Sequence, residues 1–355
     1  MASKTAEVTL ELEPETRLAV IDVSKQLVDH HGEALAPYRK HLYCSYHTTA
    51  GYLEQSLCAR MQHSRESVEA LVQSTQKLFP AGASYHHDQM HLRTELTEEQ
   101  KLVEPHNADS HLAFISLGLE NCVTYDNHPD TPVYFIDLDG VNGDMRRQRQ
   151  TTVVGYNEEA QVAEHELVIP VSKHAIDSVN LKDPRLGIME QLNELLQHYE
   201  IGKGRVILSL DSSEQQAGLT VNEYETLLMK HDLAEVLHNP IRFMAEKGMN
   251  MLRDPMAIRN KAKNYVKYDL VQIVNEVIDA LGLNESLVER VIDKFAAASA
   301  SRRLRMKRSV SLLVNNFEAE HGSIVQGTYQ SPILVQWEKA EAQNRRINVR
   351  LIRFE

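Results

Sequence analysis

Apolar and polar residues alternate along several segments of the chain, and alternation with a period of two is typical of β-strands. Strands, or mixed apolar runs bounded by turn residues, are predicted within residues 7–24, 40–50, 110–125, 131–140, 165–181 and 205–223. Residues 327–355 carry two such runs around a polar turn, which indicates a β-hairpin.

Other segments carry apolar residues at helical spacing. Amphipathic helices are predicted within residues 23–35, 64–80, 183–204, 269–282 and 286–308. The second of these begins with the N-cap signal of Ser64 and stops at Pro80. Residues 81–111 are polar and rich in histidine and lack periodicity, so they indicate a long loop of the kind that is often functional.

The order of these elements restarts in the middle of the chain, which indicates an internal duplication. An apolar run, a polar tract and an Ala-Gly pair occur at 43–52 and again at 209–225, with His47 in the first stretch where Glu214 stands in the second. A second set of anchors recurs in the same order, namely Thr131-Pro132 before Arg146-Arg147 and Ser331-Pro332 before Arg345-Arg346.

The duplication predicts two α+β domains with mixed or antiparallel sheets. The acidic stretch 155–166 is the expected boundary, which gives domains over 1–160 and 161–355. The second domain would carry a helical insertion at about 226–308. Its last part, 301–308, is a basic run that we interpret as a solvated face.

Composition narrows the range of partners. A chain of 355 residues can bury two cores, and its net charge of −12 argues against nucleic acid and anionic membranes. No apolar run has the length of a membrane span, and the N-terminus has no secretory signal. The three cysteines, Cys44, Cys58 and Cys122, suit packed, reduced thiols, so we expect a cytoplasmic protein.

Several short motifs together resemble the YjbQ family, also described as secondary thiamine-phosphate synthase. The first half has HTTA at 47–50, YHHD at 85–88 and SHL at 110–112; the second has AGLTVNE at 217–223, GTYQ at 327–330 and Arg345-Arg346. The first half lacks the Asn-Glu and GTWQ of the family, and the second lacks the three histidines. The resemblance covers most of the chain twice, apart from the helical stretch.

The resemblance implies a site, a cofactor and an assembly. His47, His87 and His111 would bind a divalent metal, zinc, with a fourth position for water or substrate, or would hold a phosphate without metal. Asn107, Asn222, Glu223 and Gln330 would contact the substrate, and Arg146 and Arg147 would be catalytic. His86, His106, Asp88 and Asp109 would orient the three imidazoles.

The implied reaction is transfer at a small phosphorylated or pyrophosphate-activated metabolite, of the thiamine-phosphate-synthase type. Family members typically form trimers, so three two-domain chains would form a homotrimer. Within it, residues retained only in the second half would complete the site, namely Asn222, Glu223, Tyr329 and Gln330. Scattered, solvated histidines are the alternative interpretation of the same pattern.

Two alternative functions remain open. Each half lacks some of the family motifs, and this loss favours a non-catalytic oligomeric scaffold. The stretch "VYFIDLDGVNGD" resembles the nucleophile motif of haloacid dehalogenases, with Asp137 as nucleophile and Asp139 as acid/base, or an oxygen-rich Ca²⁺ loop. Because the matching strand of the second half has no aspartates, a hairpin turn rich in Asp, Asn and Gly explains this motif more simply.

Overall fold

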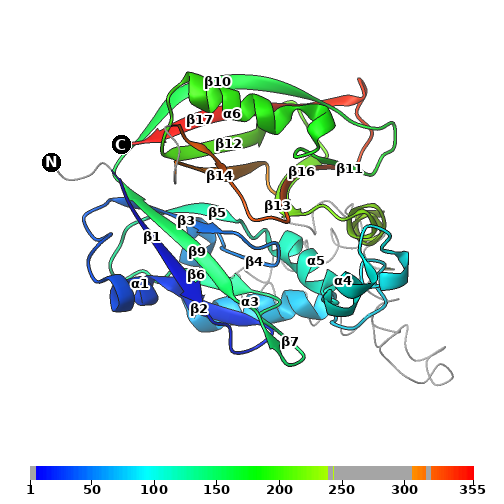
Figure 1. Ribbon diagram of the computed structural model, residues 1–355, viewed down its shortest axis with the longest axis horizontal. Coiled ribbons are helices and arrows are strands. Elements are labelled where there is room, and N and C mark those ends of the chain that lie inside the picture. Colours follow the sequence, from blue (N-terminus) through cyan, green and yellow to red (C-terminus); the bar gives the residue numbers. More distant parts are fainter. Residues whose placement is uncertain (1–4, 239–242, 244–305, 317–320) are drawn as a thin grey trace, which may run out of the picture. The chain divides into compact units, whose positions relative to one another are not determined.

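Most of the chain folds into two compact units. The computed structural model describes residues 5–238, 243, 306–316 and 321–355 (Figure 1). Unit 1 combines Met1–Gln55, Gly118–Tyr224 and Met306–Glu355, and unit 2 combines Ser56–Leu117 and Glu225–Arg305. Unit 1 contains the sheets, and the regular elements described in unit 2 are helices.

Two larger antiparallel sheets form the body of unit 1. The first has the order β1-β9-β3-β5, from β1 (Thr5–Leu12), β9 (Arg149–Tyr156), β3 (Lys40–Ser45) and β5 (Cys122–Asp126). The second has the order β10-β17-β12-β14-β15, from β10 (Glu159–Pro170), β17 (Asn344–Phe354), β12 (Gly204–Leu210), β14 (Ser309–Asn315) and β15 (Ser323–Val325).

Two smaller antiparallel sheets complete unit 1. One has the order β2-β6-β4, from β2 (Ala19–Asp22), β6 (Tyr134–Asp137) and β4 (Ala50–Gly51). The other has the order β11-β16-β13, from β11 (Asp177–Asn180), β16 (Gln330–Gln336) and β13 (Ala217–Glu223). A two-residue turn joins β7 (Val141–Asn142) to β8 (Met145–Arg146), with Gly143 at a φ of 58°.

Apolar side chains bury one face of each larger sheet against the other. Leu42 and Cys44 from β3 share a core cluster with Ile207 from β12 and Ile352 from β17. At its edge the ring of Tyr156 stacks on that of Phe354, with centroids 4.0 Å apart. All three cysteines are free and buried, which confirms that they are packed thiols.

Two helices flank the sheets of unit 1. Helix α6 (Ile188–His198) buries Ile188, Leu192 and Leu196 in a second core cluster with the opposite face of the β10-containing sheet (Figure 1). Helix α1 (Val23–His31) starts at Asp22, whose carboxylate accepts a hydrogen bond from Lys25 N. Both helices were predicted from apolar spacing.

Unit 2 is built from short helices. They are α2 (Gln55–Arg60), which begins at the unit boundary, α3 (Arg65–Leu78), the 3₁₀ turn η1 (Met90–Leu92), α4 (Glu98–Val103), α5 (Ala108–Leu117), the π-helix η3 (Leu228–Asp232) and α7 (Leu233–His238). The hydroxyl of Ser64 caps α3 by accepting from Ser67 N, as predicted. The predicted loop 81–111 contains η1, α4 and the start of α5.

The coarse α+β class is confirmed, but two detailed predictions were wrong. Residues 110–117 form helix α5, all of whose residues are buried, and not a strand. A helix that is apolar on every side has no polar face, so its periodicity cannot distinguish it from a buried strand. Strands β16 and β17 do not form a hairpin, because each pairs with other strands in a different sheet.

The predicted domain boundary and the predicted helical insertion both stay predictions. The acidic stretch 155–166 forms the end of β9 and the first part of β10, and the domain limits 1–160 and 161–355 stay predictions. In the first part of the predicted insertion, up to residue 238, the chain forms η3 and α7. Residues 244–305 lie outside the described residues, and they hold the helix predicted at 269–282, most of the one predicted at 286–308 and most of the basic run. No helix in the described part of the chain is both long and apolar enough to cross a membrane.

Candidate functional site

The predicted histidines lie on both units. His47 belongs to the loop between β3 and β4 in unit 1, whereas His87 and His111 belong to unit 2. The imidazole of His47 accepts a hydrogen bond at Nε2 from the backbone N–H of Gln150, at 2.9 Å. Burial and the nearby charges of Arg149 and Arg147 lower the pKa of His47 to about 3. His47 is therefore neutral at physiological pH, and its Nε2 lone pair is already engaged.

Side chains from the C-terminal half hold this histidine loop. The amide of Gln330 donates to the carbonyls of Ser45, at 2.9 Å, and His47, at 3.0 Å. The amide of Asn222 donates to the carbonyl of Thr48 at 3.1 Å. These two predicted substrate contacts are thus polar contacts to the backbone of the loop, and they fix its path.

The other two residues predicted to complete the site from the second half differ in exposure. Glu223 is half-buried at the end of β13, where it directly follows Asn222. Tyr329 is 71% exposed. Glu223 follows Asn222 and Tyr329 precedes Gln330, so each lies next to a residue that touches the His47 loop.

The predicted arginines do not begin the long strand. Arg146 ends β8, is exposed and lies 3.8 Å from Glu13. Arg147 follows it and donates to the carboxylate of Asp139 at 2.9 Å. Met145 and Arg146 are used by the short β7–β8 hairpin, so that β9 begins only at Arg149.

Arg149 is the buried arginine of this region, and the sequence analysis missed it. Its Nε and Nη2 donate to the two carboxylate oxygens of Asp137 at 2.7 and 2.8 Å. The same Nη2 reaches the carbonyl of Asp139, at 3.0 Å, and the hydroxyl of Thr49, at 3.3 Å. The guanidinium therefore joins β9, β6 and the His47 loop.

Both aspartates of the dehalogenase-like motif are partners of arginines. Burial raises the pKa of Asp137, and the charge and hydrogen bonds of Arg149 counteract it. Asp139 is the partner of Arg147. Each aspartate thus has a structural role, and the dehalogenase alternative stays a prediction.

In unit 2, His87 is completely buried between a carboxylate and an amide. Its Nδ1 lies 3.0 Å from Oε2 of Glu225, and its Nε2 lies 3.3 Å from Oδ1 of Asn107. The ring meets that of His111 edge-on, with centroids 5.4 Å apart. Two predicted ligands and one predicted substrate residue therefore come together.

Glu225 was not predicted, and it is the group that orients His87. Its carboxylate also accepts hydrogen bonds from the backbone N–H groups of Leu227 and Leu228, both at 2.7 Å. Burial would raise the pKa of Glu225, but the hydrogen bonds from His87 and these amides lower it. The carboxylate is ionised at neutral pH and favours a proton on Nδ1 of His87.

A second unpredicted carboxylate, Asp232, fixes the backbone at His87. Its oxygens accept from the N–H groups of His86 and His87, both at 2.9 Å, and the carboxylate is fully buried. The π-helix η3 separates it from Glu225, so one segment supplies both carboxylates. Local patterns gave no signal for either, because each lies about 140 residues from its partner (|i−j| of 138 and 145).

The predicted supporting residues have varied roles. Asp88 accepts from Ala108 N at 3.1 Å, and burial raises the pKa of Asp88 to about 6. Asp109 accepts from the amide of Gln76 at 2.6 Å. His106 is exposed, and His86 is half-buried with its ring stacked on His231. Asp88 and Asp109 therefore anchor the start of α5, which carries His111.

The donor set of unit 2 fits a divalent metal. A carboxylate that accepts from one imidazole nitrogen leaves the other nitrogen as a ligand, and Glu225 stands in this relation to His87. The remaining nitrogen, Nε2, lies 3.3 Å from the Asn107 oxygen, and the ring of His111 meets the same imidazole edge-on. His47 fits less directly, because Gln150 N–H occupies its Nε2.

Comparisons with known proteins found similar solved structures, but no matching family model and no matching curated sequence. One similar solved structure is a YbjQ-like protein of unknown function from Sulfolobus solfataricus P2. It is 14% identical, the match covers 55% of this chain and 99% of that chain, and the TM-score is 0.28. An uncharacterized conserved protein of the YjbQ family from Clostridium acetobutylicum has 14% identity, 54% and 99% coverage, and a TM-score of 0.25.

A third similar structure is a hypothetical protein from Aeropyrum pernix K1. It shares 15% identity, covers 54% of this chain and 98% of its own, and has a TM-score of 0.28. The chain is thus similar to YjbQ-like structures over about half of its length. This similarity assigns no activity, substrate or partner.

Proposed function

We propose that this protein is a metal- or phosphate-binding enzyme that acts on a small phosphorylated or pyrophosphate-activated metabolite. The observation that carries the proposal is the buried imidazole of His87, held by Glu225 and Asn107 beside the ring of His111. Burying two imidazoles and a carboxylate costs stability unless the groups are paired or used, so such clusters are typical of functional sites.

Each residue has a definite part in the proposed site. Glu225 keeps the proton of His87 on Nδ1, so Nε2 can bind a metal or, when protonated, a phosphate oxygen that replaces its contact with Oδ1 of Asn107. A zinc ion bound to His87 and His111 would supply Lewis-acid polarisation of a phosphoryl oxygen. His47 as a third ligand stays a prediction of the sequence resemblance. The transfer chemistry, of the thiamine-phosphate-synthase type, rests on the sequence resemblance.

The tandem duplication belongs to the same proposal. The strand orders β1-β9-β3-β5 and β10-β17-β12-β14 correspond, and so do β2-β6-β4 and β11-β16-β13. Three irregular backbone hydrogen bonds of the first half also have counterparts in the second half. Leu138 N to Thr49 O corresponds to Trp337 N to Gln216 O, and Ser45 N to Asn121 O corresponds to Leu210 N to Arg308 O. The third pair is Val23 N to Val133 O and Leu181 N to Pro332 O. Shared topology with shared irregular contacts supports a common ancestor of the two halves.

The duplication gives Glu214 a clear role in place of a histidine. Oε1 of Glu214 accepts from Arg346 N at 2.9 Å, just as Nε2 of His47 accepts from Gln150 N. Its other oxygen pairs with the buried Arg345, also at 2.9 Å. In the second half the loop is thus locked by an internal ion pair, and this arrangement supports a structural role for the second half.

The same correspondence changes the interpretation of the helical stretch. Unit 2 consists of the segment between β4 and β5 and the segment between β13 and β14. Because these segments occupy the same place in each half, we propose that the second is the counterpart of residues 56–117 and not an insertion.

A non-catalytic scaffold remains the second candidate function. It is favoured by Gln330 and Asn222, whose side chains bind the backbone of the His47 loop.

We further propose that the chain forms a homotrimer, in which six related halves supply two rings of three. Closed rotational symmetry would let each half meet equivalent neighbours. Sedimentation equilibrium is expected to give three times the chain mass of 40.4 kDa. A monomer or dimer across the accessible concentration range would refute the assembly and leave the site proposal intact.

The site proposal predicts a ranked loss of ligand affinity. His87→Gln is expected to abolish tight Zn²⁺ binding, and Glu225→Gln to weaken it roughly 10–100-fold, because the carboxylate only orients the ligand. Chelator-competition titration measures the metal, and calorimetry with inorganic pyrophosphate, with and without Zn²⁺, measures the anion. His91→Gln, which changes an exposed histidine of unit 2, is the control.

The two arms of this experiment separate the alternatives. Pyrophosphate binding that needs no Zn²⁺ and is lost in His87→Gln would support a phosphate site without metal. A wild-type protein that binds neither Zn²⁺ nor pyrophosphate would refute the enzyme proposal and favour the scaffold.

A further inference from the structure

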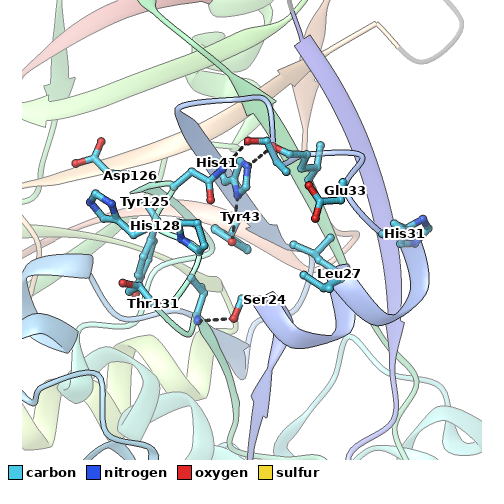
Figure 2. Close-up of a pocket in the computed structure, with 17 residues that line it drawn as sticks. Ser24, Leu27, His31, Glu33, His41, Tyr43, Tyr125, Asp126, His128 and Thr131 are labelled. Atoms are coloured by element: carbon cyan, nitrogen blue, oxygen red, sulfur yellow. Dashed lines mark hydrogen bonds between the residues drawn. The ribbon is translucent and has the colours of Figure 1, made fainter.

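A pocket of about 200 Å³ opens in unit 1, between the C-terminal turn of α1, the chain that follows it and residues 126–131 (Figure 2). Its lining includes His41 and Tyr43 from β3 and Tyr125 from β5. None of these residues belongs to the site proposed above. The volume lies below the range of about 300–1,000 Å³ typical of drug-sized ligands, so it suits a smaller molecule.

The floor of the pocket is aromatic and apolar. The rings of Tyr43 and Tyr125 meet edge-on with centroids 5.7 Å apart, and both residues are buried, as is Leu27. The hydroxyl of Tyr125 donates to Leu53 O at 2.7 Å, and that of Tyr43 lies 3.5 Å from Nδ1 of His41. Since the hydroxyls are directed to protein partners, the small part of each ring that borders the cavity is apolar.

The buried polar groups of the floor carry no positive charge. Nε2 of His41 lies 3.0 Å from the carbonyl of Leu35, which places the ring proton there, and burial lowers the pKa of His41. Burial, together with the charge of Asp22, raises the pKa of Tyr43 well above its ordinary value. Both groups are therefore neutral at physiological pH.

The electrostatic environment of the pocket favours a cation. Of the 17 described residues that line it, none is Lys or Arg, whereas Glu33 and Asp126 carry carboxylates. Leu27, Val28, His31 and Gly32 bring the C-terminal end of α1 to the cavity. The carbonyl groups at a helix C-terminus carry a partial negative charge and stabilise cations.

We propose that this pocket binds a small organic cation, an amine or heteroaromatic cation with an apolar body. The charged group would lie near the exposed carboxylate of Glu33 or of Asp126, which lie on opposite sides of the pocket (Figure 2), and the body would lie against Tyr43 and Tyr125. Aromatic faces attract cations through their quadrupole, and the attraction grows when the cation is desolvated. None of the residues that line this pocket belongs to the histidine site.

Three probes of one shape test the charge requirement in the full chain. Benzylamine, benzyl alcohol and benzoate share a ring and differ in charge, and ¹⁵N-labelled protein reports the site of binding through shifts at Tyr43 and Tyr125. Benzylamine is expected to bind roughly tenfold or more tightly than the alcohol, and benzoate not to bind.

Matched variants test the residues. Glu33→Gln with Asp126→Asn should weaken benzylamine binding roughly tenfold and leave benzyl alcohol unchanged. Asp29→Asn, which removes a carboxylate of α1 that does not line the pocket, should have no effect. Equal affinity for the three probes, no binding of benzylamine, or an unchanged double variant would overturn the proposal. All these changes leave Zn²⁺ and pyrophosphate binding intact, so failure here does not bear on the histidine site.

Discussion

Replacing Arg149 with methionine is expected to lower the free energy of unfolding by about 3–5 kcal/mol, the usual cost of removing one partner from a buried ion pair. Arg149 is 7% exposed, and Asp137, its bidentate partner, is fully buried. The substitution leaves the Asp137 charge without compensation. Urea unfolding of wild type and variant measures the loss.

Arg146→Met provides the matched control. Arg146 lies three positions earlier, is exposed, and approaches Glu13 only to 3.8 Å. Exposed pairs of this kind contribute about 0–1 kcal/mol, so the control should unfold almost as wild type does. A loss below about 1 kcal/mol for Arg149→Met would contradict the role assigned to the buried pair.

The pH dependence of the same variant follows from the direction of the Asp137 shift. Burial raises the pKa of Asp137 in the folded protein, so its ionisation reduces stability as pH rises above the unfolded value of about 3.9. Without Arg149 that penalty grows, and the deficit should be greatest near pH 7 and smallest below about pH 4. The variant should also raise the pKa of His47, which the Arg149 charge lowers, and NMR titration of the imidazole would detect this.

Arg149 also shows where sequence reasoning about this site failed. The Arg-Arg dipeptide of each half was taken as the anchor, so Arg146 and Arg147 were matched with Arg345 and Arg346. In the structure Arg149 and Arg345 are both buried, and each donates from Nη2 to a backbone carbonyl, that of Asp139 and that of Glu338, whereas Arg146 is exposed. Arg146 belongs to the β7–β8 hairpin, which a dipeptide motif cannot reveal.

Elements with a strong local signal were predicted well. Helix α3 has a serine cap, apolar spacing and a following proline, and its observed ends match these signals. Helix α5 was missed because its ten residues are buried on every side and show no period. The predicted C-terminal hairpin failed for a different reason, since strand pairing depends on distant segments that one stretch of sequence does not specify.

The same distinction applies to the histidine cluster. The motifs indicated His87, His111 and Asn107, and the structure brings these three together in unit 2. Glu225 and Asp232 were not indicated, although they determine the orientation and the backbone of His87. A carboxylate that serves a distant histidine has no fixed spacing from it, so only the folded chain reveals the pair.

Replacing Asp232 with alanine is expected to destabilise unit 2 by about 2–4 kcal/mol, because two buried backbone N–H groups lose a charged acceptor. Those groups belong to His86 and His87, each 2.9 Å from a different carboxylate oxygen of Asp232. Asp232→Asn should cost less, since the amide oxygen still accepts one of these hydrogen bonds while its NH₂ group faces the other donor. Urea unfolding would give the order of the variants.

Hydrogen exchange distinguishes this local role from a general loss of stability. The amide protons of His86 and His87 should exchange faster in Asp232→Asn than in wild type, beyond the change in global stability. Glu99→Gln alters an exposed carboxylate of helix α4 in the same unit and should leave both amides protected. Because the ring of His87 is held by Glu225 and its backbone by Asp232, Asp232→Asn should also weaken pyrophosphate or Zn²⁺ binding. Wild-type exchange at both amides in Asp232→Asn would show that the carboxylate does not fix this backbone, and the site would then depend on Glu225 alone.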